Sequence, residues 1–296
     1  MTKHDLIRKQ GWSLNQKIDH TLGAIEQFYN KYNGKVYVSF SGGKDSTVLL
    51  HITRMMFPNI PGVFADTGLE YPEIRKFVKE TPNTIMVKPK RNFKYVIDKY
   101  GYPVISKKIS MGVNRYRGTS SALQKELRLY GGINPTSGKK QHPTITKKWH
   151  YLIDAPFKIS EKCCDFLKKE PLKTYEKSTG RKPIIATMAE ESAFRVQEYL
   201  RNGCNAFDKK NPQSTPMMFW LEKDIWDYIK KFNIPYSSIY DMGYSRTGCM
   251  FCLFGIMKDK SPNRFQQMAK THPKQYQYCL NKLDLKTPLN FIGVDY

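Results

Sequence analysis

Six consecutive residues have the composition of an anion-binding loop: Ser41-Gly42-Gly43-Lys44-Asp45-Ser46. The loop follows the apolar stretch 36–40 and precedes an apolar run that begins at Val48. Its glycines allow a sharp turn and a close backbone approach, and the first amides of the following helix have no internal partner, so the loop suits a phosphate. Lys44 adds a positive charge, and Ser46 or Thr47 is expected to cap the helix. The loop is too short for the Walker pattern Gly-x-x-x-x-Gly-Lys-Ser/Thr, which excludes an ordinary P-loop NTPase.

Four of the six cysteines form two pairs with metal-binding potential. Cys163 and Cys164 are adjacent, and Cys249-x-x-Cys252 follows about 85 residues later. A Cys-x-x-Cys unit alone is compatible with zinc, a redox disulfide or iron–sulfur chemistry. Four thiolates fit either a zinc ion or a 4Fe–4S cluster, and buried thiols without a ligand are the third alternative. The remaining cysteines, Cys204 and Cys279, show no activating feature and are expected to be structural.

Strands and helices alternate along the chain, and they must position these groups. The residue pattern predicts strands at 36–40, 63–65, 84–87 and 183–188. It predicts helices at 6–32, 46–56, 93–100, 121–129 and 165–174, and an amphipathic helix within 216–229. In an open parallel sheet, ligands bind outside the carboxyl ends of the strands. Two further polar runs stand at such ends, Asp66-Thr67-Gly68 and 189–195.

Three motifs together resemble one superfamily. Ser-Gly-Gly-Lys-Asp-Ser resembles the PP-loop of the ATP pyrophosphatase (adenine nucleotide α-hydrolase) superfamily, whose members hold a nucleotide pyrophosphate or a sulfate there. The run 66–73, Asp-Thr-Gly-Leu-Glu-Tyr-Pro-Glu, is similar to the second signature of its phosphoadenosine phosphosulfate reductase-like members. Glu190, Glu191, Ser192 and Arg195 match a third signature, in which Met188 replaces an arginine. Because that cation would hold sulfate or phosphate, its loss weakens the case for a sulfonucleotide.

The resemblance covers roughly residues 30–255 and implies a fold and a site. The implied fold is α/β, a parallel twisted sheet with helices on both faces and a mainly helical C-terminal part. Lys44, Asp45 and Asp66 would be catalytic. The residues implied to bind nucleotide are Ser39, Ser41, Gly42, Gly43, Lys44, Asp45, Ser46, Asp66, Thr67, Gly68, Glu191 and Arg195. The implied ligands are ATP or a sulfonucleotide, with Mg²⁺.

The cysteine spacing adds a second resemblance. A tandem pair followed by Cys-x-x-Cys resembles the cluster-binding pattern of assimilatory adenosine phosphosulfate reductases. It is also similar to that of the sulfur-transfer component of bacterial DNA phosphorothioation. The resemblance implies a 4Fe–4S cluster held by Cys163, Cys164, Cys249 and Cys252. The C-terminal Glu-Cys-Gly-x-His string of sulfonucleotide reductases is missing, because Cys279 lies in Gln-Tyr-Cys-Leu-Asn.

Composition favours a polyanionic partner. The net charge is +23, from 49 Lys and Arg against 26 Asp and Glu. This surplus favours a nucleic acid, tRNA or DNA, although a merely solubilising surface is the alternative. Segment 104–149 is basic and is expected to consist of loops around one helix, either a lid or polyanion contact or a solvated excursion. No apolar run approaches the ~20 residues of a membrane span, and no secretory signal is seen, so a cytoplasmic location without membrane contact is expected.

The predicted organisation is an N-terminal helix at 1–35, a PP-loop domain at 36–255 with the insertion 104–149, and an extension at 256–296. Three functions remain open. The first is an iron–sulfur enzyme that uses ATP to thiolate a nucleic acid, with a sulfur donor such as a cysteine desulfurase. The second is an adenosine phosphosulfate or phosphoadenosine phosphosulfate reductase that produces sulfite. The third is a non-catalytic regulatory protein that senses nucleotide and cluster.

Overall fold

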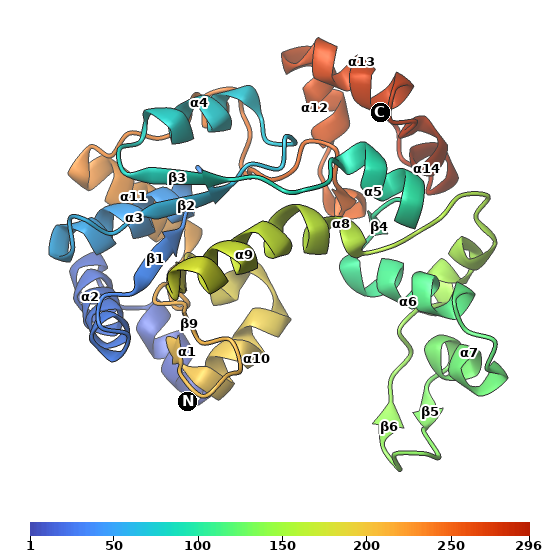
Figure 1. The fold of residues 1–296 in the computed structure, drawn as a ribbon, viewed down its shortest axis with the longest axis horizontal. Coiled ribbons are helices and arrows are strands. Elements are labelled where there is room, and N and C mark those ends of the chain that lie inside the picture. The colour runs from blue at the N-terminus through green and yellow to red at the C-terminus, as the bar shows by residue number, and fades with distance from the viewer. The chain divides into compact units, whose positions relative to one another are not determined.

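The computed structural model describes residues 1–296 (Figure 1). The chain forms two compact units, and each is assembled from separate stretches. The first unit comprises Met1–Asp66, Glu70–Lys88 and Pro171–Thr247, and the second comprises Thr67–Leu69, Pro89–Glu170 and Gly248–Tyr296. The domain boundaries that the sequence suggests stay predictions. None of the helices combines the length and the apolar character that crossing a lipid bilayer requires.

A six-stranded sheet forms the centre of the first unit. Its strand order is β3-β2-β1-β7-β9-β8, and every neighbouring pair is parallel except β8 and β9. Val38 of β1 pairs with Gly62 of β2 on one side and with Ile184 of β7 on the other. The strands are β1 (Val36–Ser39), β2 (Gly62–Ala65), β3 (Thr84–Val87), β7 (Lys182–Ile185), β8 (Asn205–Ala206) and β9 (Gln213–Ser214).

Helices cover this sheet on both faces. Tyr37 of β1 donates a hydrogen bond from its hydroxyl to Glu176 at 2.9 Å, and its ring meets Tyr175, both in α9. Its neighbours Val36 and Val38 point to the opposite face and are fully buried. The helices of this unit are α1 (Lys3–Gln10), α2 (Leu14–Lys31), α3 (Lys44–Met56), α4 (Pro72–Glu80), α9 (Glu170–Thr179), α10 (Ala193–Asn202) and α11 (Glu222–Phe232), with short 3-10 turns η3 (Ala189–Glu191) and η4 (Ser238–Tyr240). The predicted α/β fold is confirmed.

The second unit is mainly helical. Its helices are α5 (Phe93–Tyr100), α6 (Lys107–Arg117), α7 (Ala122–Leu129), α8 (Lys162–Cys164), α12 (Arg264–Thr271), α13 (Pro273–Asn281) and α14 (Lys286–Phe291), joined by the 3-10 segments η1 (Lys147–Asp154) and η5 (Ile256–Lys258) and the π-helical turn η2 (Asp165–Lys169). Two small sheets accompany them, β4 (Val104–Ile105) with β10 (Leu253–Phe254), and the hairpin β5 (Gly132–Ile133) with β6 (Lys140–Gln141).

Two helix predictions were wrong. The region expected as one helix at 6–32 is two helices, α1 and α2, because Ser13 starts a new helix with a capping box: its hydroxyl accepts from the Gln16 amide at 3.4 Å, and its own amide donates to the Gln16 side chain at 3.0 Å. In segment 104–149 the structure adds α6 to the expected helix near 121–129. Ser106 caps α6 by accepting from the Ile109 amide at 3.2 Å.

Candidate functional site

The predicted phosphate loop is a tight turn between β1 and α3. Gly42 adopts a positive φ of 72°, and a Cβ there would lie 2.7 Å from a methyl of Val78, so only glycine fits. Gly43 is the N-cap of α3, without a side-chain cap. The prediction that Ser46 or Thr47 caps this helix was wrong. Both hydroxyls instead donate to the carbonyl of Gly43, at 2.9 Å and 3.0 Å.

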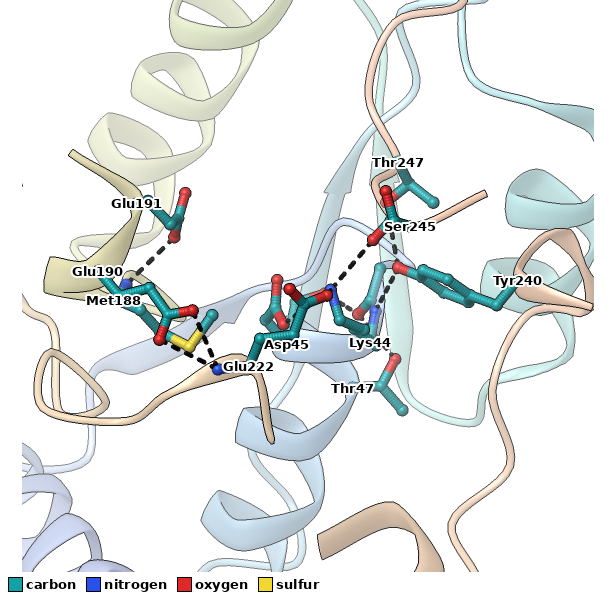
Figure 2. A network of polar contacts seen from close by, with 12 residues as sticks. Lys44, Asp45, Thr47, Met188, Glu190, Glu191, Glu222, Tyr240, Ser245 and Thr247 are labelled. Atoms are coloured by element: carbon teal, nitrogen blue, oxygen red, sulfur yellow. Dashed lines mark hydrogen bonds and ion pairs between the residues drawn. The ribbon is translucent and has the colours of Figure 1, made fainter. Parts of the chain in front are cut away.

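Lys44 is the charged centre of the loop. Its side chain is buried, and its Nζ lies 3.2 Å from Glu222 Oε1 and 3.6 Å from Asp45 Oδ1 (Figure 2). The ammonium also donates to the carbonyl of Ser245 at 3.3 Å. Burial acts to lower the pKa of Lys44, but Asp45, Tyr240 and Glu222 outweigh it, and the pKa is raised. Lys44 is therefore a fixed cation at the start of a helix, where the helix dipole adds to its attraction for anions.

Tyr240 contacts the first amide of the helix. Its hydroxyl accepts a hydrogen bond from the Lys44 backbone N–H at 2.8 Å, and the Lys44 ammonium lies 5.6 Å from the centre of its ring (Figure 2). A Cβ on Gly43 would meet Thr247 Oγ1 at 2.7 Å, so the segment 240–247 lies directly against the loop. An amide at this position is the donor that a bound phosphate oxygen would use.

Asp45 carries a carboxylate that the protein does not fully satisfy. Its Oδ1 is buried and has no hydrogen-bond partner. Burial raises the pKa of Asp45, Lys44 opposes this effect, and the charges of Glu191 and Glu222 raise the pKa further. The only cation paired with this oxygen is Lys44, at 3.6 Å, and with two acidic neighbours the carboxylate is at a position that favours a further cation.

The other predicted residues at strand ends have partners of their own. Asp66 forms an ion pair with Arg75 at 2.9 Å. Glu191 forms an ion pair with Arg195 and accepts a hydrogen bond from the Met188 amide at 3.2 Å. Ser39 ends β1 and is half-buried. Met188, the residue that replaces the family's arginine, is buried.

The structure thus brings part of the predicted set together. Ser41, the glycines, Lys44, Asp45 and Ser46 form the loop itself, and Glu191 lies close enough to act on the pKa of Asp45. Ser41 joins the two ends of the loop, since its amide donates to Ser46 Oγ at 3.1 Å. Thr67 and Gly68 belong to the second unit. There the hydroxyl of Thr67 accepts from the Leu69 amide at 3.2 Å, which makes a local turn.

Sequence reasoning missed four residues that touch the loop: Glu222, Tyr240, Ser245 and Thr247. They lie about 180 to 200 residues after it, so no local spacing connects them to it. The nearest sequence signal was the stretch 216–229, in which the sequence predicted a helix. Glu222 is the first residue of that helix, α11.

The four predicted cysteine ligands line one cavity in the second unit. Its other lining residues are Lys168 and the apolar residues Leu69, Phe93, Pro103, Leu167 and Phe251. The Cys163 thiol donates to Cys164 Sγ at 4.0 Å. This hydrogen bond raises the pKa of Cys163 and lowers that of Cys164 to about 6, and Lys168 and Lys107 lower the latter further. Burial raises the pKa of Cys252 to about 12.

The two remaining cysteines, Cys204 and Cys279, are buried and do not line this cavity. Burial raises the pKa of Cys204 to about 11 and that of Cys279 to about 12. Neither has the lowered pKa of a nucleophilic thiol. Nowhere in the structure do three or more His, Cys, Asp or Glu side chains gather closely enough to hold a metal ion.

Comparison with known proteins identifies relatives along most of the chain. The family model of the phosphoadenosine phosphosulfate reductase domain matches residues 35–125 and 122–253. An adenosine 5'-phosphosulfate reductase of Lysinibacillus sphaericus is 26% identical over 267 residues, which cover 88% of this chain and 93% of that protein. An uncharacterized protein of Methanocaldococcus jannaschii is 24% identical over 84% of this chain.

The lengths of the relatives differ. The chain spans 49% and 39% of two uncharacterized proteins of Methanocaldococcus jannaschii that it matches. Among solved structures, a phosphoadenylyl-sulfate reductase of Candida auris aligns with 84% of this chain and 96% of that one, at 13% identity and a TM-score of 0.44. The family match spans the phosphate loop and both cysteine pairs. The chain belongs to the phosphoadenosine phosphosulfate reductase family of the PP-loop superfamily.

Proposed function

We propose that this protein is a sulfur-transfer enzyme that binds Mg²⁺ and ATP at the N-terminus of α3 and activates an oxygen of a nucleic acid. The acceptor oxygen attacks the α-phosphorus of ATP, the bond to the bridging oxygen breaks, and pyrophosphate leaves. A sulfur nucleophile then displaces AMP from the adenylated acceptor, so that sulfur replaces the oxygen. The observation that carries this proposal is the ion pair at a helix start between buried Lys44 and Asp45, whose buried Oδ1 accepts no hydrogen bond.

Lys44 and the loop amides act on the leaving group. Pyrophosphate gains negative charge as the α–β bond breaks, and a fixed ammonium with backbone donors stabilises that charge without rearranging. In the structure Glu222 and Asp45 contact the ammonium, and the Tyr240 hydroxyl accepts a hydrogen bond from the Lys44 amide. Phosphate oxygens would take over these donors. Tyr240 therefore preorganises the loop and has to yield its hydrogen bond when ATP binds.

Asp45 fits a magnesium ion by the chemistry of its oxygen. Mg²⁺ prefers one or two carboxylates together with phosphate oxygens and water, so one buried Oδ1 is a sufficient protein ligand. When bound, the ion neutralises charge on the phosphates. Glu191 and Glu222 add to the negative potential around Asp45. These acidic neighbours favour a metal-bound triphosphate over a sulfonucleotide bound without metal, as does Met188 in place of a cation.

We further propose that the second unit holds an iron–sulfur cluster. Four cysteine side chains line one cavity together with apolar residues and Lys168, and a Cys₄ set is the usual ligand set of a 4Fe–4S cluster. The hydrogen bond from Cys163 and, after it, the charges of Lys168 and Lys107 lower the pKa of Cys164, and the two lysines would also stabilise it as a thiolate ligand. These cysteines would hold the cluster, and the cluster would bind sulfide for the displacement of AMP. Sulfur from a donor such as a cysteine desulfurase arrives as a persulfide, so a thiol reductant would have to supply the two electrons that release it as sulfide.

A reductase is the second candidate. The relative that aligns with the chain over 93% of its own length is named an adenosine 5'-phosphosulfate reductase. Such an enzyme would place the sulfonucleotide at the same loop and release sulfite. It needs a thiol nucleophile, however, and Cys204 and Cys279 are both buried with raised pKa values.

Pyrophosphate release tests the proposal. Anaerobically purified protein is given Mg²⁺ and ATP, with and without bulk tRNA or DNA. We expect release that requires the nucleic acid and falls at least about 100-fold in Lys44→Ala. Lys94→Ala is the matched control, because Lys94 is also ion-paired, with Asp98 at 2.8 Å, but on the exposed surface of α5. Sulfite production from a sulfonucleotide without any pyrophosphate release would favour the reductase. If the protein forms neither sulfite nor pyrophosphate, it is a non-catalytic sensor.

A further inference from the structure

We propose that the β5–β6 hairpin and its base bind unpaired nucleotides of the acceptor nucleic acid. We call this surface the hairpin face and define it by Tyr130, Ile133, Lys139, Lys140, Lys147 and Lys148. The inference rests on the proposed function in one respect, that the acceptor is a nucleic acid. It adds where on the protein the strand binds and which form of nucleic acid fits.

Charge is concentrated here beyond the average of the chain. Residues 104–149 contain ten Lys and Arg and a single acidic residue, Glu126. Of the ten, only Lys107 forms an ion pair, with Asp165 at 3.2 Å. The four lysines of the hairpin face are all exposed. Unneutralised, exposed lysines close together in the chain attract a phosphate backbone and release its counterions on binding.

The hairpin is an ordered arm. The Arg128 carbonyl accepts hydrogen bonds from the amides of Thr144 at 2.9 Å and Ile145 at 3.0 Å, and Ile145 is fully buried. At the tip, the Asn134 carbonyl accepts from the Gly138 amide at 2.8 Å, and the Asn134 amide donates to the Lys139 carbonyl at 3.0 Å. The base is thus fixed and the turn is closed by its own hydrogen bonds. Figure 1 shows the hairpin extending beyond α7 within the second unit.

Despite this order, the arm exposes apolar and aromatic surface. Tyr130 and Ile133 are each 69% exposed. The Tyr130 ring meets only the edge of His150, at 5.8 Å between ring centres, and Lys148 lies 4.9 Å from the Trp149 ring centre. Aromatic rings placed among lysines are how proteins bind single strands, since bases stack on the rings while phosphates meet the cations. A duplex offers its bases less readily, so the hairpin face favours unpaired nucleotides.

Fluorescence anisotropy on the full-length, nucleotide-free protein tests this inference. The probes are labelled 20-mers of one mixed sequence, as single-stranded DNA, single-stranded RNA and duplex DNA. We expect a single strand to bind more tightly than the duplex. The variant Lys139→Glu/Lys140→Glu/Lys147→Glu/Lys148→Glu should lose at least tenfold in affinity, and the slope of log K against log salt should fall by about 3, at roughly 0.7 for each lost phosphate contact.

Two further variants complete the design. Tyr130→Ala should weaken single-strand binding by about tenfold and leave duplex binding nearly unchanged, because it removes stacking alone. Lys79→Glu/Lys230→Glu is the charge control, since both lysines are exposed and belong to the first unit. It should bind as the wild type does. Three results would overturn the inference. The quadruple variant could bind as tightly as the wild type, the charge control could lose as much affinity as the quadruple variant, or the protein could prefer anionic lipid vesicles to the oligonucleotides.

The result is separable from the proposed function. Binding is measured without ATP, whereas pyrophosphate release depends on the loop of the first unit. Lys44→Ala protein that binds the oligonucleotide normally and releases no pyrophosphate would support both proposals. If the wild-type protein releases pyrophosphate with tRNA or DNA but the quadruple variant still binds the strand, the proposed function stands and the proposed role of the hairpin face is refuted.

Discussion

The hydroxyl of Tyr240 accepts a hydrogen bond from the backbone N–H of Lys44 at 2.8 Å, at the first turn of α3. The amide belongs to the loop motif, and the hydroxyl comes from a residue 196 positions later in the chain. Tyr240 is also buried enough that its pKa is raised, so the hydroxyl stays protonated at neutral pH. The Tyr240 side chain therefore satisfies a donor that a bound phosphate would use.

Tyr240→Phe should bind ATP more tightly and be less stable without it. The change leaves the Lys44 amide without its acceptor, and an unsatisfied buried donor costs about 1–3 kcal/mol. Because ATP would satisfy that amide, we expect a lower Tm of the free protein and an affinity gain of several-fold. Calorimetric titration and thermal denaturation check both effects. A weaker affinity would instead indicate that the hydroxyl contacts the bound nucleotide.

Cys164→Ala and Cys252→Ala should each remove iron and the visible charge-transfer absorbance from anaerobically purified protein. Both side chains line the cavity that we assign to the cluster. Cys204→Ala and Cys279→Ala serve as matched controls outside it and should keep both signals. Metal analysis that finds zinc and no iron in the wild type would refute the cluster assignment.

Lys17→Met should destabilise the first unit by about 3 kcal/mol. Lys17 is 1% exposed, and its Nζ lies 2.5 Å from Asp224 Oδ2, so removing the ammonium leaves a carboxylate without its cation in the interior. Urea denaturation measures the loss. The double variant Lys17→Met/Asp224→Asn should recover part of it, because asparagine is neutral and still accepts from the Leu221 amide. Lys223→Met, in an exposed ion pair with Asp227, should cost less than about 1 kcal/mol.

Acidification should destabilise the fold through His51. Burial lowers the pKa of His51, which shares a 2.8 Å hydrogen bond with the Tyr228 hydroxyl. Below the ordinary value of 6.5 the unfolded chain binds a proton that the native state resists, so this contribution to stability is present above pH 6.5 and is lost as pH falls through the native pKa. His20, whose pKa is lowered by burial and by Lys9, acts in the same direction.

His51→Gln should flatten the pH dependence of unfolding between pH 7.5 and pH 5. The exposed His142 provides the control, and His142→Gln should leave the slope unchanged. Denaturant midpoints at several pH values measure it. If the free energy of unfolding depends on pH equally in His51→Gln and His142→Gln, groups other than His51 cause the acid sensitivity.

The sequence by itself determined the loop, the strands and the cysteine pairs. These features are local: β1, β2, β3 and β7 are short apolar runs, and Gly42 stands where a positive φ and the methyl of Val78 exclude any side chain. Binary pattern and backbone geometry specify such elements without reference to the rest of the chain. The family resemblance predicted that Cys163 and Cys164 lie near Cys249 and Cys252, and all four line one cavity in the structure.

Only the tertiary structure decided how the loop is surrounded. Glu222 and Tyr240 reach Lys44 because the sheet brings α11 and the segment after it back to the carboxyl end of β1, and a contact across about 180 residues leaves no periodic trace. The capping error had the same origin. Ser46 and Thr47 have the right chemistry for a cap, but the turn presents the Gly43 carbonyl to both hydroxyls. Local composition fixes which groups a segment offers, whereas the partners of those groups depend on packing between distant segments.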